Sequence, residues 1–146
     1  MSERDIQDQL DQWYPTEHFD VVLRCWKLRY VTTKYHNHCG EHPQITRACI
    51  KNPGFQKLMN ECRSRAELVW AHGQACIRVV CICCHGRHRS VAVSSILKAV
   101  YLKEGFNSLG PFHFSKRDMW DVCHTCKHCK SNDHKEELFT SLAHQF

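Results

Sequence analysis

The stretch CIRVVCICCHGRHRSVAVSSILKAVYLK, residues 76–103, predicts a strand, a polar loop and a helix in direct succession. Residues 76–83 form a nearly continuous apolar run, which is typical of a strand buried on both faces of a parallel sheet. Residues 90–103 have apolar side chains at helical spacing, and Gly105 provides a helix stop. A strand that leads through a loop into a helix is a building unit of α/β folds, so we expect an α/β protein.

The rest of the chain extends this pattern in both directions. We expect a helix at 2–13 ended by Pro15, a strand at 19–26, a weaker strand at 44–50 ended by the turn Asn52-Pro53-Gly54, a helix at 55–72 ended by Gly73, a strand at 111–114 and a short helix at 135–144. Strands that alternate with helices indicate a small, partly parallel sheet of about four strands with flanking helices. The predicted organisation is a polar lead-in (1–18), an α/β domain (19–120) and a Cys/His-rich tail (121–146).

Composition limits the class of protein. A chain of 146 residues with 42% hydrophobic residues suits one folded domain and argues against disorder. The net charge of +5 fits an anionic ligand or a nucleic acid. The polar N-terminal residues do not resemble a signal peptide, and no run approaches the roughly 18 apolar residues of a membrane helix. Since eleven cysteines cannot all pair within one chain, we expect reduced thiols and a cytoplasmic protein.

The loop between the predicted strand and helix is the main candidate site. It runs Cys83-Cys84-His85-Gly86-Arg87-His88-Arg89-Ser90. The amides of a helix's first turn lack intrahelical partners and favour an anion, while Gly86 allows close backbone approach and Arg89 can hold two phosphate oxygens. We therefore expect a phosphate-like group to be held by residues Cys84, His85, Gly86, Arg87, His88, Arg89 and Ser90.

A second chemistry fits the same loop. Cys83 and Arg89 have the Cys-x5-Arg spacing of cysteine-dependent phosphatases, in which a thiolate attacks phosphorus while the arginine holds the oxygens. Such an enzyme also needs a general acid for the leaving group. Asp20, Asp118 and Asp121 are available, but the sequence does not place any of them near the loop.

Residues 83–92 also carry a family resemblance. The loop, followed by Val91-Ala92, is similar to the Cys-x-Gly-Gly-x-His-Arg-Ser loop in the C-terminal domain of RapZ-like RNase adapter proteins. Asn52-Pro53 and the segment 113–118 resemble further features of that domain, so the resemblance covers roughly residues 19–120. It implies a sensor for an amino sugar phosphate such as glucosamine-6-phosphate, with RNA or protein partners and self-association.

Two departures from the family pattern stand out. His85 replaces the first glycine of the family loop. The nucleotide-binding domain that full-length members carry has a Gly-x4-Gly-Lys-Ser/Thr motif, which does not occur in this chain. We therefore expect no bound nucleotide and no ATP hydrolysis.

The tail contains a possible metal site. Cys123, Cys126 and Cys129 are spaced Cys-x2-Cys-x2-Cys, and His134 follows, so three thiolates and one imidazole could bind Zn2+. An iron–sulfur cluster is less favoured because no clear fourth thiolate is present, and a solvated polar loop remains an alternative. A second cluster, His36-Asn37-His38-Cys39 with His42, is better interpreted as a polar loop with unrelated imidazoles.

Taken together, these patterns favour a non-catalytic domain that binds a phosphate or phosphosugar as a sensor or adapter. A Cys83-dependent phosphatase is the first alternative. A metal-organised adapter for RNA or protein, centred on residues 113–134, is the second.

Overall fold

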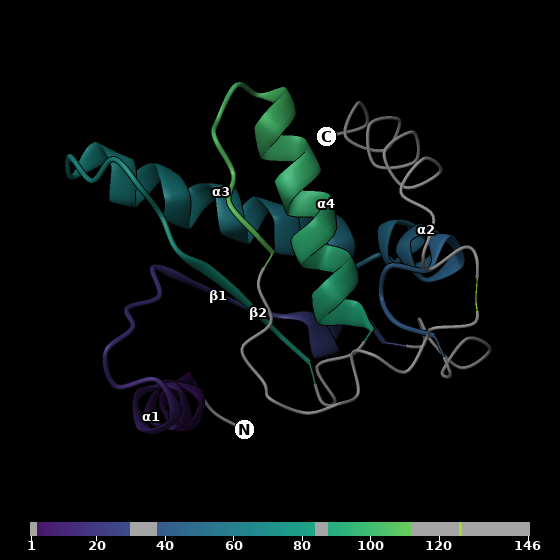
Figure 1. Cartoon of the computed structure of the whole chain (residues 1–146), viewed down its shortest axis with the longest axis horizontal. Coiled ribbons are helices and arrows are strands. Elements are labelled where there is room, and N and C mark those ends of the chain that lie inside the picture. Colours follow the sequence, from purple (N-terminus) through teal and green to yellow (C-terminus); the bar gives the residue numbers. More distant parts are fainter. Residues whose placement is uncertain (1–2, 30–37, 84–87, 112–125, 127–146) are drawn as a thin grey trace.

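The computed structural model describes residues 3–29, 38–83, 88–111 and Cys126, and its architecture is α/β. Within those residues the elements run, in order, α1 (Glu3–Trp13), β1 (Val21–Arg24), the 3-10 turn η1 (Cys25–Lys27), α2 (Pro43–Lys51), α3 (Phe55–Ala71), β2 (Val79–Ile82) and α4 (Arg89–Lys103). Figure 1 shows α2, α3 and α4 on one side of the strand pair, with α1 apart from them. The predicted helices at 2–13, 55–72 and 90–103 are confirmed to within a residue or two.

The sheet in the described residues consists of two parallel strands. Val21 pairs with Val79, and the register continues to Arg24 opposite Ile82. The connection between the strands passes through α2 and α3, as parallel pairing requires a long crossover. We predicted about four strands, and the described part of the chain contains two. The strand predicted at 111–114 lies outside the described residues, apart from Pro111.

The burial of β2 differs from the prediction. All four of its residues are half-buried rather than buried on both faces. In β1, by contrast, Val21 and Leu23 are fully buried. The prediction of a strand buried on both faces was therefore wrong for the described residues, in which β2 pairs with β1 in a two-stranded sheet.

The segment 44–50 was predicted as a strand, and that prediction was wrong. These residues belong to α2, in which Ile45, Thr46 and Cys49 form the buried face. Pro43 occupies the first turn, where its missing N–H costs nothing. His42 is the N-cap, and its Nδ1 accepts a hydrogen bond from the Gln44 N–H at 3.2 Å. The β-branched residues suggested a strand, but the start signal and tertiary burial determined a helix.

Side chains from β1, α2, α3 and α4 share one hydrophobic core. From α3 it receives Phe55, Leu58, Met59 and Cys62, which recur at helical spacing. From α4 it receives Ala92, Val93, Ile96, Leu97 and Val100. At the start of α4, four consecutive residues from Ser90 to Val93 are buried. The first turn of α4 is therefore fixed against the rest of the domain.

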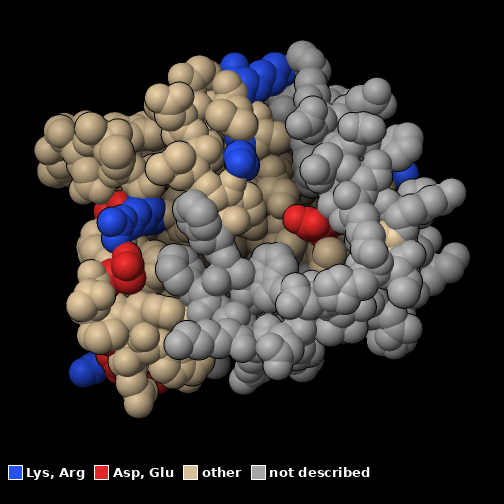
Figure 2. All heavy atoms as spheres, in the orientation of Figure 1, with Lys and Arg blue, Asp and Glu red and all other residues tan. Residues whose placement is uncertain are grey.

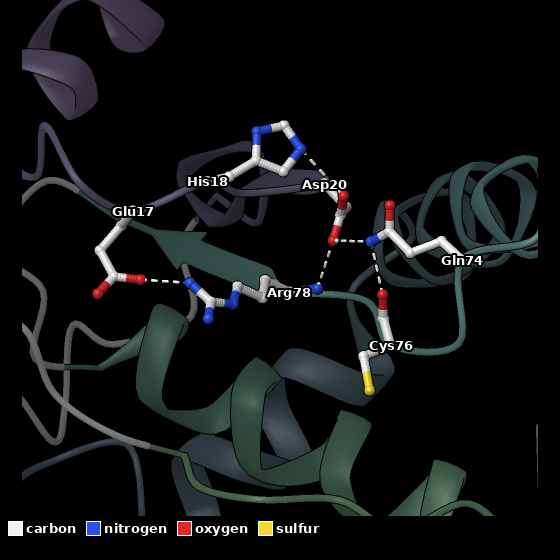
Figure 3. Close-up of polar contacts among 6 residues, drawn as sticks. All are labelled: Glu17, His18, Asp20, Gln74, Cys76 and Arg78. Carbon is white, nitrogen blue, oxygen red and sulfur yellow. Dashed lines mark hydrogen bonds and ion pairs between the residues drawn. The ribbon is translucent and has the colours of Figure 1, made fainter.

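Polar contacts hold the amino ends of the two strands together (Figure 3). The Asp20 carboxylate accepts hydrogen bonds from the Arg78 backbone N–H at 2.7 Å and from the Gln74 side chain at 3.0 Å. Arg78 also forms an ion pair with Glu17. Partial burial acts to raise the pKa of Asp20, but these hydrogen bonds and His18 outweigh it and hold the pKa below its usual value.

α1 buries Ile6 and Leu10, while Trp13 at its end is exposed. None of the helices in the described part of the chain has the length and apolarity that crossing a bilayer requires.

Candidate functional site

The loop that follows β2 lies at the carboxyl end of the parallel sheet, where ligands of open α/β folds commonly bind. β2 ends at Ile82, Cys83 follows, and α4 begins at Arg89. Of the predicted phosphate-binding residues, His88, Arg89 and Ser90 are described. Cys84, His85, Gly86 and Arg87 lie outside the described residues.

The N-terminus of α4 has backbone donors at this loop. His88 is its N-cap, and within the described residues its side chain makes no cap hydrogen bond. The first intrahelical bond runs from the Ala92 N–H to the His88 carbonyl at 2.9 Å, so the amides of the preceding turn lie outside the helical ladder. These amides and the helix dipole favour an anion.

Ser90 lies inside α4, one residue after its start at Arg89. It is 6% exposed and its hydroxyl oxygen accepts a hydrogen bond from the Cys83 thiol at 3.2 Å. This contact joins the end of β2 to the first turn of α4 across the loop. It also places a nucleophilic atom and a hydroxyl side by side at the base of the loop.

Arg89 has a structural role that the sequence did not reveal. Its NH1 atom donates to the carbonyl oxygens of Trp26 at 3.0 Å and Leu28 at 3.2 Å. Since one guanidinium carries five N–H donors, the remaining donors could still contact a ligand. Replacement by alanine would nonetheless leave two backbone carbonyls without this partner, so Arg89→Ala is not a pure test of ligand binding.

Gly40 brings a second loop against the same helix terminus. A Cβ added at Gly40 would lie 2.0 Å from the His88 carbonyl oxygen and 2.6 Å from the Ala92 nitrogen. The backbone at Gly40 is therefore packed directly on the first turn of α4. Thr46 supports this loop, because its hydroxyl donates to the Gly40 carbonyl at 3.3 Å. Sequence reasoning missed Gly40, since its neighbour α4 is distant in the chain.

Most buried thiols near the sheet are protonated and unsuited to nucleophilic attack. Burial raises the pKa of Cys49 to about 12, against the opposing effect of the Arg89 charge. Burial also raises the pKa of Cys25 well above its usual value, and that of Cys62 to about 11. Cys83 is only half-buried and lies near the N-terminus of α4, so it is better placed for thiolate chemistry than these three thiols.

Of the candidate general acids, only Asp20 is described, and it does not lie near Cys83. Asp20 precedes β1 and binds the Arg78 N–H at the amino end of the sheet. A four-residue strand is roughly 13 Å long, so Asp20 lies about that distance from the loop at the carboxyl end. Asp118 and Asp121 lie outside the described residues.

The structure brings together three metal-ligating residues from both clusters noted in the sequence. Ligand atoms of His38, His42 and Cys126 all lie within 4.8 Å of one another. The interpretation of His38 and His42 as unrelated imidazoles therefore does not fit their placement. The other predicted ligands, Cys123, Cys129 and His134, lie outside the described residues, as does His36. The His-x3-His spacing of residues 38 and 42 was the signal that could have linked them.

Charge on the surface is dispersed. Figure 2 shows Lys and Arg side chains of the described residues separated from one another on the face that it presents. A continuous basic stripe, which is typical of nucleic-acid binding, is not visible on that face among those residues.

Comparison with protein-family models, curated proteins and solved structures finds no match to the chain. The resemblance of roughly residues 19–120 to the RapZ-like C-terminal domain therefore stays a prediction from the sequence.

Proposed function

We propose that residues 83–90 bind the phosphate group of a small phosphorylated molecule, and that the chain is a non-catalytic sensor or adapter domain. The observation that carries the proposal is the N-terminus of α4, which begins at Arg89, shortly after the parallel strand β2 ends at Ile82. Backbone donors and the helix dipole at such a point favour phosphate. By the family resemblance, the ligand class is an amino sugar phosphate.

Two features of the described residues support this proposal. The Cys83–Ser90 hydrogen bond and the burial of Ser90 to Val93 make the helix terminus rigid, which reduces the entropy lost on binding. Arg89 has its positive charge at the same turn, and its contacts with Trp26 and Leu28 restrict the guanidinium. A pre-organised cation beside the first-turn amides of a helix suits a phosphate dianion.

The first experiment is a thermal-shift titration with inorganic phosphate, glucosamine-6-phosphate and glucosamine. A ligand present at 100 times its Kd stabilises the fold by about 2.7 kcal/mol, which is roughly 5–11 °C in Tm for a chain of this size. We expect glucosamine-6-phosphate to raise Tm and unphosphorylated glucosamine to have no effect. If neither phosphate compound raises Tm, the proposal is wrong.

Direct binding measurements identify the residues involved. Because Arg89→Ala also removes contacts within the fold, its affinity for phosphate is measured by calorimetry at a temperature well below the variant's Tm. Arg89→Lys is measured in the same way. The matched control is Arg78→Ala, which removes the same charge from the opposite end of β2. We expect Arg89→Ala to weaken phosphate binding at least tenfold and Arg78→Ala to leave it unchanged. Equal loss in both variants would indicate nonspecific charge attraction.

A second candidate function is a cysteine-dependent phosphatase, which the 3.2 Å contact between Cys83 Sγ and Ser90 Oγ favours. A serine hydroxyl that accepts from a thiol can rotate and donate to the thiolate, the nucleophilic form. The sulfur would form a bond to phosphorus as the bond to the leaving oxygen breaks, and that oxygen would take a proton from solvent water. Water would then hydrolyse the phosphocysteine and release phosphate.

Phosphate release from para-nitrophenyl phosphate distinguishes the two functions. Turnover that disappears in Cys83→Ser and persists in Cys49→Ser would establish the phosphatase, since the Cys49 thiol stays protonated. Binding of phosphate without release would support the sensor. An RNA or protein partner and self-association remain predictions from the resemblance alone, and strong salt dependence of RNA binding would support the former.

A further inference from the structure

The cluster of His38, His42 and Cys126 has the residue types and the spacing of a zinc site. Two imidazoles and one thiol lie with their ligand atoms within 4.8 Å of one another. His42 is buried, and His38 and Cys126 are half-buried. The two rings are 4.4 Å apart between centroids and inclined at 51°. Nitrogen and sulfur donors at this proximity are the preferred ligands of Zn2+ in proteins.

Zinc binding would require the three ligand atoms to move slightly closer together. Zn–N bonds of about 2.0–2.1 Å and Zn–S bonds of about 2.3 Å place tetrahedral ligand atoms roughly 3.3–3.6 Å apart. The present separations of up to 4.8 Å therefore require the side chains to move together by about 1 Å. Side-chain torsions can supply such a movement without a change in the backbone.

The protonation of His42 suits a metal ligand. Its Nδ1 accepts the Gln44 N–H at 3.2 Å, which requires that nitrogen to be unprotonated and the ring to be neutral. Coordination through Nδ1 would replace this hydrogen bond. Coordination through Nε2 would move the ring proton to Nδ1 and break the same bond. Either way, metal binding competes with the cap of α2.

We propose that His38, His42 and Cys126 bind one Zn2+ ion, which ties the Cys/His-rich C-terminal segment to the loop before α2. The ligand set differs from the tail-only set of Cys123, Cys126, Cys129 and His134 that the sequence predicted. The fourth position falls to Cys123, to Cys129 or to water, and single serine variants decide among them. This proposal does not depend on the phosphate-binding proposal.

The position of the ion has a consequence for the neighbouring helix. Gly40, between the two histidines, packs on the His88 carbonyl and the Ala92 nitrogen. Zn2+ held by two neutral imidazoles, one thiolate and water carries a net charge of +1, and a second thiolate in the fourth position makes the site neutral. In either case the ion would order the 38–42 loop near the first turn of α4.

The test measures metal binding by the full chain. Metal-free protein is titrated with Co2+, whose absorption reports tetrahedral geometry and thiolate ligation, and Zn2+ affinity is obtained by competition. The ligand variants are His38→Ala, His42→Asn and Cys126→Ser. Asparagine at position 42 retains an acceptor for the helix cap while removing the imidazole, so α2 stays intact. The controls are His72→Asn and Cys76→Ser, an exposed histidine and an exposed thiol elsewhere.

We expect one Zn2+ per chain, bound more than about 100-fold more weakly in each ligand variant, because loss of even an indirect partner costs 10–100-fold. The controls should bind as the wild type does. Full affinity in both His38→Ala and His42→Asn would overturn the proposal in favour of the tail-only site. A chain that gives no Co2+ absorption and no Zn2+ binding would overturn it as well. Circular dichroism of each variant confirms that lost binding does not reflect unfolding.

Discussion

Gly40→Ala is expected to be strongly destabilising, although it adds a single methyl group. The new Cβ would lie 2.0 Å from the His88 carbonyl oxygen, 2.6 Å from the Ala92 nitrogen and 2.7 Å from the Val91 Cβ. Ordinary van der Waals contact begins at 3.4 Å, so the Gly40 backbone and α4 must separate by roughly 1 Å or more. Backbone atoms cannot relieve the overlap by rotating away, as a flexible side chain could.

The expected cost follows from this overlap. Overpacking of a core costs about 1–3 kcal/mol, and clashes with rigid backbone atoms place Gly40→Ala at about 3 kcal/mol or more. That corresponds to a fall in Tm of roughly 6–12 °C or more for a domain of this size. The assay is urea unfolding followed by circular dichroism, with a thermal melt of the same samples.

Gly73→Ala is the matched control. Gly73 has a φ of +88° and nothing within 4 Å of an added Cβ, so alanine there meets backbone strain of about 1–2 kcal/mol and no clash. Gly40→Ala should therefore be the more destabilised variant. It should also bind metal and phosphate more weakly, because the 38–42 loop moves. If Gly40→Ala unfolds at the same urea concentration as the wild type, or above Gly73→Ala, the packing argument is refuted.

Three further predictions concern single side chains. The lowered pKa of Asp20 stabilises the fold above the unfolded pKa of about 3.9, and this contribution is lost as pH falls through the folded pKa. In urea unfolding, Asp20→Asn should therefore be about 1–2 kcal/mol less stable than the wild type at pH 7 and closer to it at pH 3. Arg89→Ala should lose about 2–3 kcal/mol of stability, and Arg89→Lys should lose less because lysine can restore one of the two charged hydrogen bonds. Equal stability of Arg89→Ala and the wild type would contradict the structural role of Arg89. Mass spectrometry of timed samples should show that iodoacetamide at pH 8 labels Cys49 and Cys62 only on the timescale of unfolding, while it labels the exposed Cys76 at once. Rapid labelling of Cys49 would contradict its raised pKa and its burial.

Local patterns predicted the elements on which the candidate site depends. The apolar run before Cys83, the polar loop and the spacing after Ser90 indicated a strand, a loop and a helix, and β2 and α4 confirm both elements. Gly73 and Gly105 end helices at positive φ, as the sequence indicated. Such signals are readable because they depend on a residue and its near neighbours. The segment 44–50 shows the limit, since its strand-like composition yielded to the helix start at His42 and Pro43.

Long-range contacts were not predictable in the same way. Arg89 was expected to face a ligand, yet its guanidinium also holds the carbonyls of Trp26 and Leu28. Asp20 was one of three candidate acids until the parallel register placed it at the amino end of the sheet. In both cases the partner lies about sixty residues away in the chain. Residue type alone does not specify such a partner.

By itself, the sequence determined the α/β class and the strand–loop–helix at residues 76–103, because these depend on local periodicity and on helix-terminus signals. Only the tertiary structure decided that Gly40 packs on the first turn of α4 and that His38 and His42 meet Cys126. The physical reason is that the long crossover between parallel strands brings together residues that are far apart in the chain. No local sequence pattern specifies which distant residues will meet.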